Sequence, residues 1–379
     1  MRETVGDLDI LATAADGAAV IERFARYGEV KQVLSRGSTR ASAILRSGLQ
    51  VDLRVVPEQS YGAALAYFTG SKAHNIAIRK LGQARGLKIN EYGVFRGAKR
   101  VAGETEESVY RAVGMPYIEP ELREDRGEIE AARDARLPRL VSLADLRGDL
   151  HAHTKWSDGH HSVREMALAA KTRGLSYLAI TEHSARLAVA HGVDAVRLAA
   201  QGKEIDLLNR ELDGIRILKG IEVDILEDGR LDLEDAALAG LDIVIAAVHS
   251  KFALSRVRQT ERVLAALEHP RVRILAHPTG RLIEARDPYD IDMNAVIRKA
   301  AARSVALELN AHPERLDLLD TTCRMAKEQG VLVAINSDAH STLEFDNLQF
   351  GVGQARRGWI GPGDVLNCRP LADLLRHLR

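Results

Sequence analysis

The stretch GDLHAHTKWSD, at residues 148–158, decides the fold of this chain. It starts as a short extended run and then places His151 and His153 two positions apart, with Asp158 close behind. Side chains i and i+2 of an extended strand point to the same side, so both imidazoles are expected to face one pocket. The stretch therefore predicts a strand that ends in metal-binding side chains.

The chain after this stretch alternates strand-like and helix-like segments. The predicted strands are Gly148–His151, Tyr177–Thr181, Ile215–Val223, Ile243–Val248, Ile274–Ala276, Ala306–Leu309 and Leu332–Asn336. The predicted helices are Val163–Arg173, Ala195–Leu212, Ser255–Glu268, Met293–Ala302 and Arg315–Gln329. Repeated βα units imply parallel strands with right-handed crossovers, and about seven of them predict a closed or nearly closed βα barrel.

Metal-binding side chains follow or lie within most of these predicted strands. The set comprises His151, His153, Asp158, His183, Glu222, His249, His277, Asp338 and His340. All strand C-termini of a parallel barrel open onto one face, so these side chains are expected to converge. A lone histidine after a strand is usually a hydrogen-bonded loop residue, but repetition at successive strand ends argues against coincidence. His160 and His161 border the expected pocket, and the other histidines do not share the pattern.

This set indicates metal-dependent hydrolysis of phosphate esters. Imidazole and carboxylate ligands suit Zn²⁺, Mn²⁺ or Fe²⁺. One ion takes about four to six ligands, so the set predicts two or three metals, with Glu222 as a bridging ligand. Clustered metals lower the pKa of a bound water and hold the phosphate while charge builds on the leaving oxygen. Lys251 and Arg281 follow two of the strands and are candidate phosphate-binding cations, or equally plain surface cations.

Composition bounds the remaining possibilities. The 379 residues suggest two or three domains, and the basic and acidic residues balance at 53 each, so net charge gives no hint of a nucleic-acid partner. The two cysteines form no disulfide framework, which fits a reducing cytoplasm. The N-terminus has no signal-peptide character and no apolar run approaches the roughly 20 residues of a membrane span, so we expect a cytoplasmic protein.

One local stretch, residues 71–100, is strongly basic. Its cations, against Glu91 alone, are Lys72, Arg79, Lys80, Arg85, Lys88, Arg96, Lys99 and Arg100. Such a stretch could meet a phosphate backbone or form a solvated helix face, and charge alone favours neither.

The N-terminal residues predict a small α/β unit with a second carboxylate cluster. The expected strands are Val5–Thr13, Val30–Leu34, Ala41–Leu45 and Leu49–Val56, with a helix at Gly17–Tyr27. Asp7 and Asp9 lie two apart on one strand, and Asp52 lies on another. Three acids on neighbouring strands could hold two Mg²⁺ against a triphosphate, as in nucleotidyl transfer, although solvent-facing acids on an edge strand are the commoner case.

Two family resemblances follow from these residues. The run around His151, His153 and Asp158, with Thr-Glu-His183, Gly-Ile-Glu222, Val-His249-Ser, Ala-His277-Pro and Ser-Asp338-Ala-His340, resembles a PHP (polymerase and histidinol phosphatase) domain. The resemblance implies a distorted seven-fold βα barrel in which the nine side chains bind a trinuclear metal cluster. Glu182, where relatives often carry Asp, is the one departure, and that position is not a ligand in the family.

The N-terminal part is similar to bacterial family X DNA polymerases, the PolX family. Tyr67-Phe68-Thr69-Gly70-Ser71-Lys72-x-His74-Asn75 and Lys88-Ile89-Asn90-Glu91-Tyr92-Gly93 resemble their thumb region. The resemblance implies Asp7, Asp9 and Asp52 as catalytic metal ligands, with Mg²⁺ or Mn²⁺, in a nucleotidyltransferase-type palm. It also implies that Tyr67, Phe68, Gly70 and Asn75 line the incoming dNTP.

The resemblance also implies a domain plan. It comprises a palm at residues 1–58, a thumb at 59–115, a linker at 116–145 and a PHP phosphoesterase domain at 146–379. The lyase-like and fingers domains and the triphosphate-gripping Gly-Ser element have no counterpart, so we expect an N-terminally truncated form in which DNA synthesis is in doubt.

The expected activity is a bacterial, Mn²⁺-dependent 3′–5′ exonuclease for DNA repair, with end processing at abasic sites or 3′-phosphates. Its expected substrates are primer ends and gapped or single-stranded DNA. Two alternatives stay open, namely a small-molecule phosphatase of the histidinol-phosphatase type and a non-catalytic DNA-binding module. The attached palm and thumb disfavour the first. Nine ligands disfavour the second, because structural zinc sites are usually closed by four.

Overall fold

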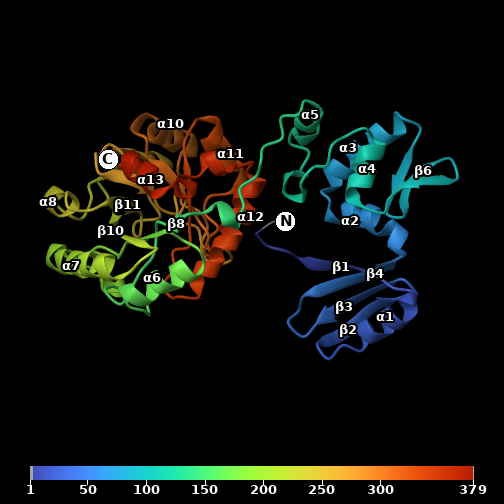
Figure 1. Ribbon diagram of the computed structural model, residues 1–379, viewed down its shortest axis with the longest axis horizontal. Coiled ribbons are helices and arrows are strands. Elements are labelled where there is room, and N and C mark those ends of the chain that lie inside the picture. Colours follow the sequence, from blue (N-terminus) through green and yellow to red (C-terminus); the bar gives the residue numbers. More distant parts are fainter. Residues whose placement is uncertain (1–2, 379) are drawn as a thin grey trace. The chain divides into compact units, whose positions relative to one another are not determined.

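The computed structural model describes residues 3–378, and the chain divides into two units, Met1–Leu137 and Pro138–Arg379. Each unit has its own sheet and hydrophobic core (Figure 1). The division falls at Leu137, inside the predicted linker at residues 116–145. Within residues 3–378, every helix is too short or too polar to cross a bilayer.

The second unit is built on a sheet of seven parallel strands in the order β14-β13-β12-β11-β10-β9-β8. The strands are β8 (Gly148–Asp149), β9 (Tyr177–Ile180), β10 (Arg216–Asp224), β11 (Ile243–Ala247), β12 (Val272–Leu275), β13 (Ala306–Asn310) and β14 (Val333–Asn336). All seven correspond to the strands expected from the sequence, and the predicted nearly closed βα barrel is confirmed.

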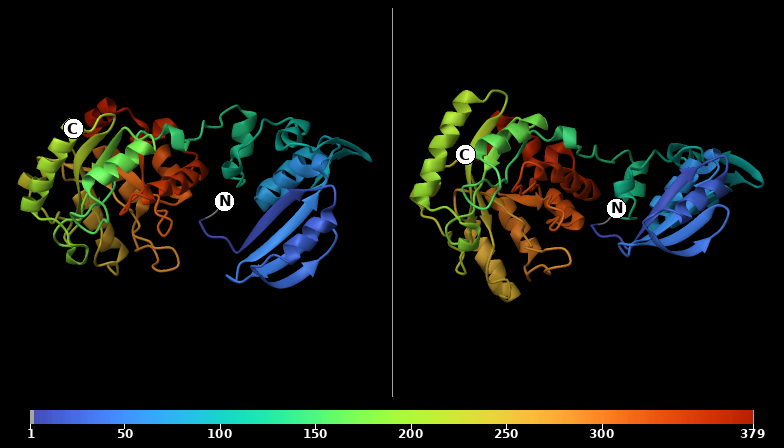
Figure 2. Two further views of the ribbon diagram at one scale, coloured as in Figure 1. Left: turned by 60° about the horizontal axis from the view of Figure 1, so that its bottom comes forward. Right: turned by 90° about the horizontal axis from the view of Figure 1, so that it is seen from below.

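The helices surround this sheet (Figures 1 and 2). They are α6 (Val163–Thr172), α7 (Ala195–Glu211), α8 (Asp235–Leu238), α9 (Arg256–Ala266), α10 (Met293–Arg303), α11 (Asp320–Glu328), α12 (Leu348–Arg357) and α13 (Leu371–Leu378). Their starts follow from capping chemistry. Ser162 and Glu165 form a capping box at α6, and Asp194 accepts the Arg197 N–H at the start of α7.

The sequence pattern predicts α11 too early and does not predict α8, α12 or α13. The expected start of α11 was Arg315, but the helix begins at Asp320. The residues between Arg315 and Asp320 form hydrogen bonds with the loop that contains Thr279 and Gly280 instead. The buried carboxylate of Asp317 accepts the backbone N–H groups of Thr279 and Gly280, each at 2.9 Å.

Interactions between β8 and β14 bring the two edges of the sheet together. Ala152 and Ala339 form an isolated parallel bridge just beyond the two strands. The carboxylate of Asp149 accepts the backbone N–H of Ser337 at 3.2 Å, and its hydroxyl as well. A side chain at Gly148 would approach the ring of Tyr177 to 2.0 Å, so only glycine permits the spacing of β8 and β9. The opening stretch of the domain thus brings the barrel close to closure.

The barrel interior is apolar at one end and polar at the other. The interior cluster includes Leu218, Ile245, Ala306 and the C-terminal helix residue Leu374, so α13 closes the end opposite the strand C-termini. Toward the C-terminal ends of the strands, the side chains that face the interior are carboxylates and amides. This change within the strands creates the functional site.

The first unit holds a four-stranded sheet in the order β1-β4-β3-β2. The strands are β1 (Asp7–Thr13), β2 (Val30–Arg36), β3 (Arg40–Leu45) and β4 (Gln50–Val56), with β1 and β4 parallel. Helix α1 (Gly17–Ala25) packs on this sheet through Ile21 (Figure 2). The four strands and this helix lie where the sequence predicts them.

A helical part and a small sheet follow in the same unit. They comprise α2 (Tyr61–Thr69), α3 (Lys72–Gln83), β5 (Lys88–Asn90), β6 (Gly93–Arg96), β7 (Lys99–Ala102) and α4 (Glu106–Ala112). Residues 116–137 include α5 (Glu128–Arg133). The buried Glu128 lies 2.6 Å from His74 Nδ1, and the buried Arg123 lies 2.6 Å from Glu106, so this segment is held against α3 and α4.

Candidate metal centre

Glu222 lies at the centre of the histidines that the sequence singles out. It belongs to β10 and is 1% exposed. Its Oε2 lies 2.7 Å from His183 Nδ1 and 3.5 Å from His151 Nε2. Its Oε1 lies 2.8 Å from His277 Nε2 and 3.2 Å from His249 Nε2. Four strand ends thus meet at one carboxylate, which is the position expected for the predicted bridging ligand.

The remaining predicted ligands adjoin this carboxylate. Asp338 Oδ1 lies 3.4 Å from His151 Nε2 and 3.2 Å from His153 Nε2. Asp158 lies 3.5 Å from both His183 and His340. The structure therefore brings together all nine side chains that the sequence predicts as ligands.

Three subsets have ligand atoms that all lie within 4.8 Å of one another. They are His153, Asp158, His183 and His340; His151, His153 and Asp338; and His183, Glu222 and His249. The first and second share His153, and the first and third share His183. Shared members mean that the three candidate ion positions are neighbours in one centre.

Buried polar atoms that lie close together without forming hydrogen bonds show that the centre fits metal ions. These buried atoms, which have no hydrogen-bond partner among the described residues, are His151 Nε2, His153 Nδ1, His153 Nε2, His183 Nδ1, Glu222 Oε2, His249 Nε2 and His277 Nδ1. An unsatisfied buried polar atom costs about 1–3 kcal/mol. A dense group of them at one point is explained if divalent cations are their partners.

The electrostatics of the centre also suit cations. Burial raises the pKa of Glu222, but the surrounding histidines lower it by a larger amount. The resulting pKa is well below the ordinary value. Burial lowers the pKa of His153 to about 3, and the nearby His340 and His183 lower it too. Glu222 is therefore charged and His153 neutral at pH 7, which are the forms that bind metals.

Two candidate ligands have uncommon backbone conformations. His277 has φ 26° and Asp338 has φ 55°. Positive φ in a non-glycine residue costs about 1–3 kcal/mol and collects at functional sites. The surrounding hydrogen bonds hold these two positions. The His277 N–H donates to Glu308 at 2.7 Å, and Asn310 donates to Asp338 at 2.9 Å.

Glu308 is a functional candidate that the sequence pattern does not identify. It is fully buried on β13, and its Oε1 lies 2.7 Å from His151 Nδ1. Asn336 donates to the same carboxylate at 2.9 Å. A carboxylate behind a metal-binding histidine fixes its tautomer and ring orientation, so that Nε2 faces the centre. The available signal was a charged residue inside an otherwise apolar strand, ALELN at residues 306–310.

Glu182 supports the centre without entering it. It is fully buried and accepts the Thr154 N–H at 3.1 Å and the Gln201 amide at 2.8 Å. It also accepts the Ser157 hydroxyl. These bonds hold the loop that carries Asp158. Glu182, which stands where relatives often carry Asp, therefore supports the loop.

The described contacts of the two predicted phosphate-binding cations lead away from the ligands. Lys251 is exposed, with its Nζ 3.7 Å from Glu227. Arg281 Nε donates to the Arg315 carbonyl at 2.8 Å. Arg315 itself has its Nε 3.5 Å from Asp338 Oδ2, which makes it a cation beside a candidate ligand that sequence reasoning missed.

The first unit gathers the second carboxylate cluster. The parallel register of β1 and β4 places Asp9 opposite Asp52, and Asp7 points to the same side as Asp9. Burial raises the pKa of Asp9, and the charges of Asp7 and Asp52 raise it further. Asp52 is buried and accepts the Gln50 amide at 2.9 Å. The three predicted acids therefore lie close enough to repel one another.

The predicted nucleotide-binding residues lie at the α2–α3 junction of this unit. The rings of Tyr67 and Phe68 meet edge to face at 5.0 Å, and Asn75 donates to the Tyr67 carbonyl at 2.7 Å. Gly70 joins the two helices with φ 75°. Phe68 and Asp9 line one cavity of about 410 Å³, so this cavity reaches the carboxylate cluster.

The two units thus define a class, a metallo-phosphoesterase barrel joined to a polymerase-type palm and thumb. Family models agree, since the PHP domain matches residues 149–337 and the DNA polymerase beta thumb matches residues 64–124. The "DNA polymerase/3'-5' exonuclease PolX" of Bacillus subtilis (strain 168) is 44% identical over 382 residues, which cover 100% of this chain and 67% of that protein. The chain belongs to the PolX family of bacterial family X DNA polymerases.

Other relatives match only parts of the chain. A "Probable phosphatase" of Syntrophotalea carbinolica is 31% identical over 238 residues, covering 60% of this chain and 94% of that protein. A crystal structure of Leishmania infantum polymerase beta, "Ternary P/T complex", has 24% identity and a TM-score of 0.29, covering 32% of this chain and 62% of that one.

Proposed function

We propose that the chain is a metal-dependent DNA phosphodiesterase that removes nucleotides from 3′ ends during DNA repair. The observation that carries the proposal is the nine-ligand centre around Glu222 in a chain whose whole length matches a PolX exonuclease. Two or three divalent ions are the natural content of such a centre, with Mn²⁺, Zn²⁺ or Fe²⁺ as candidates. Ends with an abasic site or a 3′-phosphate are further substrates of the same chemistry.

Different side chains would have different roles in hydrolysis. Divalent metals, when bound, would supply Lewis-acid activation of a water and positive charge for the phosphate. Glu222, whose carboxylate lies among His151, His183 and His249, would be a ligand common to neighbouring ions. Arg315 lies beside Asp338, and its guanidinium would contact a non-bridging phosphate oxygen. Glu308 and Asn310 hold the ligands in the orientation that the metals require.

A small-molecule phosphatase is not favoured. The relatives named as phosphatases match between 51% and 60% of this chain, while the PolX relative matches all of it. A small ester needs no palm or thumb. A non-catalytic metal site is also disfavoured, because four ligands suffice for structural zinc.

The carboxylate cluster of the first unit supports a second candidate function. Asp7, Asp9 and Asp52 lie on adjacent strands beside the cavity that Phe68 lines. We propose that these acids hold Mg²⁺ or Mn²⁺ with a dNTP. Tyr67, Gly70 and Asn75 would then lie on the nucleotide side of the site.

A substrate panel tests the main proposal. Single-stranded and primer–template DNA with a 5′ label, histidinol phosphate and a generic phosphomonoester would each be incubated with Mn²⁺ and with chelator. Stepwise 3′ shortening that requires Mn²⁺ is the expected result. Turnover of the small esters alone would favour the phosphatase, and binding without cleavage would favour a DNA-binding module.

A further inference from the structure

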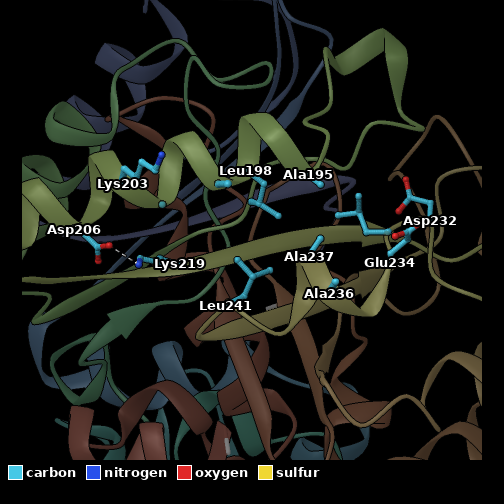
Figure 3. Close-up of a pocket in the computed structure, with 14 residues that line it drawn as sticks. Ala195, Leu198, Lys203, Asp206, Lys219, Asp232, Glu234, Ala236, Ala237 and Leu241 are labelled. Atoms are coloured by element: carbon cyan, nitrogen blue, oxygen red, sulfur yellow. Dashed lines mark hydrogen bonds and ion pairs between the residues drawn. The ribbon is translucent and has the colours of Figure 1, made fainter.

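A groove on the second unit lies apart from the metal centre. It has a volume of about 680 Å³ and opens between α7 and the short helix α8, beside β10 (Figure 3). The described residues that line it include none of the nine candidate metal ligands. Ligand-binding clefts have volumes of about 300–1,000 Å³, so this groove is large enough for a specific occupant.

Apolar residues make up much of the groove lining, both small ones and Leu198, Leu233 and Leu241. Ala195, Ala199 and Gly202 follow one another at i, i+4 and i+7 on α7, which places them on one face of the helix. Ala236 and Ala237 form the opposite wall on α8. Ala195, Ala199 and Ala236 are exposed, so the structure leaves an apolar surface between two helices open to solvent.

The two ends of the groove carry opposite charges. Figure 3 shows Lys203 toward one end and Glu234 toward the other. Within residues 3–378, the side chains of Lys203 and Glu234 take part in no described ion pair or hydrogen bond. Lys219, at the same end as Lys203, is neutralised by Asp206, whose Oδ2 lies 2.8 Å from its Nζ. A partner that satisfies both ends needs a negative group at one end and a positive group at the other.

We propose that this groove binds an amphipathic helix of a partner protein. Its apolar face would lie on the alanines, with an acidic side chain near Lys203 and a basic one near Glu234. Helix-in-groove recognition uses apolar anchors spaced i, i+3, i+4 and i+7, and an alanine-lined floor lets such a helix approach closely. The inference goes beyond the proposed nuclease function and does not rest on it.

The chemistry of the groove disfavours other occupants. A nucleic-acid strand needs a consistently positive path, but Asp206, Asp232 and Glu234 line this groove. A small-molecule site has polar groups that converge on one point. Here the charged side chains lie at the two ends instead, a separation that fits an elongated peptide.

Two tryptophan variants of the intact protein test the groove. Ala199→Trp fills it, while Ala200→Trp places the same side chain on an exposed residue of α7 that does not line it, because successive helix positions differ by about 100°. A displayed library of amphipathic helical peptides would be selected on the wild-type protein. Ala199→Trp should weaken the selected peptides at least tenfold, which is about 1.4 kcal/mol. Ala200→Trp should leave their affinity within twofold.

Charge reversal tests the proposed orientation. Lys203→Glu should weaken peptides that carry an acid at the matching position, and replacing that acid with lysine should restore binding. A selection without enriched peptides, or peptides that are indifferent to Ala199→Trp, would overturn the proposal. A wild-type dimer that Ala199→Trp dissociates would also overturn it, since the occupant would be a second copy. Unchanged melting temperature and metal content of both tryptophan variants establish that the fold is intact, independently of nuclease activity.

Discussion

The carboxylate of Glu308 lies 2.7 Å from Nδ1 of His151, while Nε2 of the same ring faces the candidate metal centre. Removing such a carboxylate typically costs 10- to 100-fold in metal affinity, so we expect Glu308→Ala to weaken Mn²⁺ binding by about that factor. Glu308→Gln keeps an oxygen that can accept the His151 Nδ1–H, and it should retain most of the affinity. Titration calorimetry and metal analysis after dialysis would measure the difference. Equal affinity in Glu308→Ala and wild type would show that the contact does not position the ligand.

Proton release on metal binding is a second expectation at this scale. Burial opposes the charge on His183 and His340, but Glu222 and Asp158 outweigh it and raise their pKa values to about 10 and about 9. Both imidazoles are therefore protonated at pH 7 in the metal-free protein, and a metal must displace those protons. Mn²⁺ affinity should rise as pH increases toward these values and fall as pH decreases.

Calorimetry in buffers of different ionisation enthalpy counts these protons directly. The expected count near pH 7.5 is one or more for each protein molecule. His153, with its pKa lowered to about 3, contributes none. A heat of binding that is independent of the buffer would contradict the protonated state of His183 and His340.

At the scale of elements, α13 closes the apolar end of the barrel. Leu374 is fully buried in the interior cluster with Leu218 and Ile245. Leu→Ala at such a site costs about 2–5 kcal/mol, so Leu374→Ala should lower the free energy of unfolding of the second unit by that amount. Both tryptophans, Trp156 and Trp359, belong to this unit, and their fluorescence in a urea titration would follow it.

The half-buried neighbour Asp373 provides the control for this helix. Asp373→Ala removes a surface pair with Arg376, and it should change the free energy of unfolding by less than about 0.5 kcal/mol. A loss of stability in Leu374→Ala no greater than in Asp373→Ala would mean that α13 is not part of the barrel core.

The elements also show what a sequence can reveal. Buried parallel strands are apolar runs, and their ends carry the histidines, so strand positions and the nine candidate ligands were predictable from local pattern. Glu308 was not, because its role depends on β13 lying beside β12 and β14 and on a contact with His151 far away in the chain. The late start of α11 has the same origin, since Asp317 is used by a loop that only the folded barrel brings near.

At the scale of the whole molecule, the chain carries two carboxylate-based sites on two separately folded units. The metal centre lies in Pro138–Arg379, and the cluster of Asp7, Asp9 and Asp52 lies in Met1–Leu137. Because the units have separate cores, the effects of variants in one site should not spread to the other. Sites that share no partner residues usually behave additively.

A pair of variants tests this independence. His151→Ala combined with His153→Ala removes two ligands and should abolish Mn²⁺-dependent DNA hydrolysis, a loss of at least about 100-fold. DNA binding, measured by fluorescence anisotropy at fixed salt, should change little, because the basic stretch at residues 71–100 lies in the other unit. Asp52→Asn should do the reverse, leaving exonuclease activity near wild type while weakening binding of a Mn²⁺–dNTP complex. If the double variant hydrolysed DNA as fast as the wild type, His151 and His153 would not belong to the catalytic centre. If Asp52→Asn lost its exonuclease activity, the activity of the second unit would depend on the first.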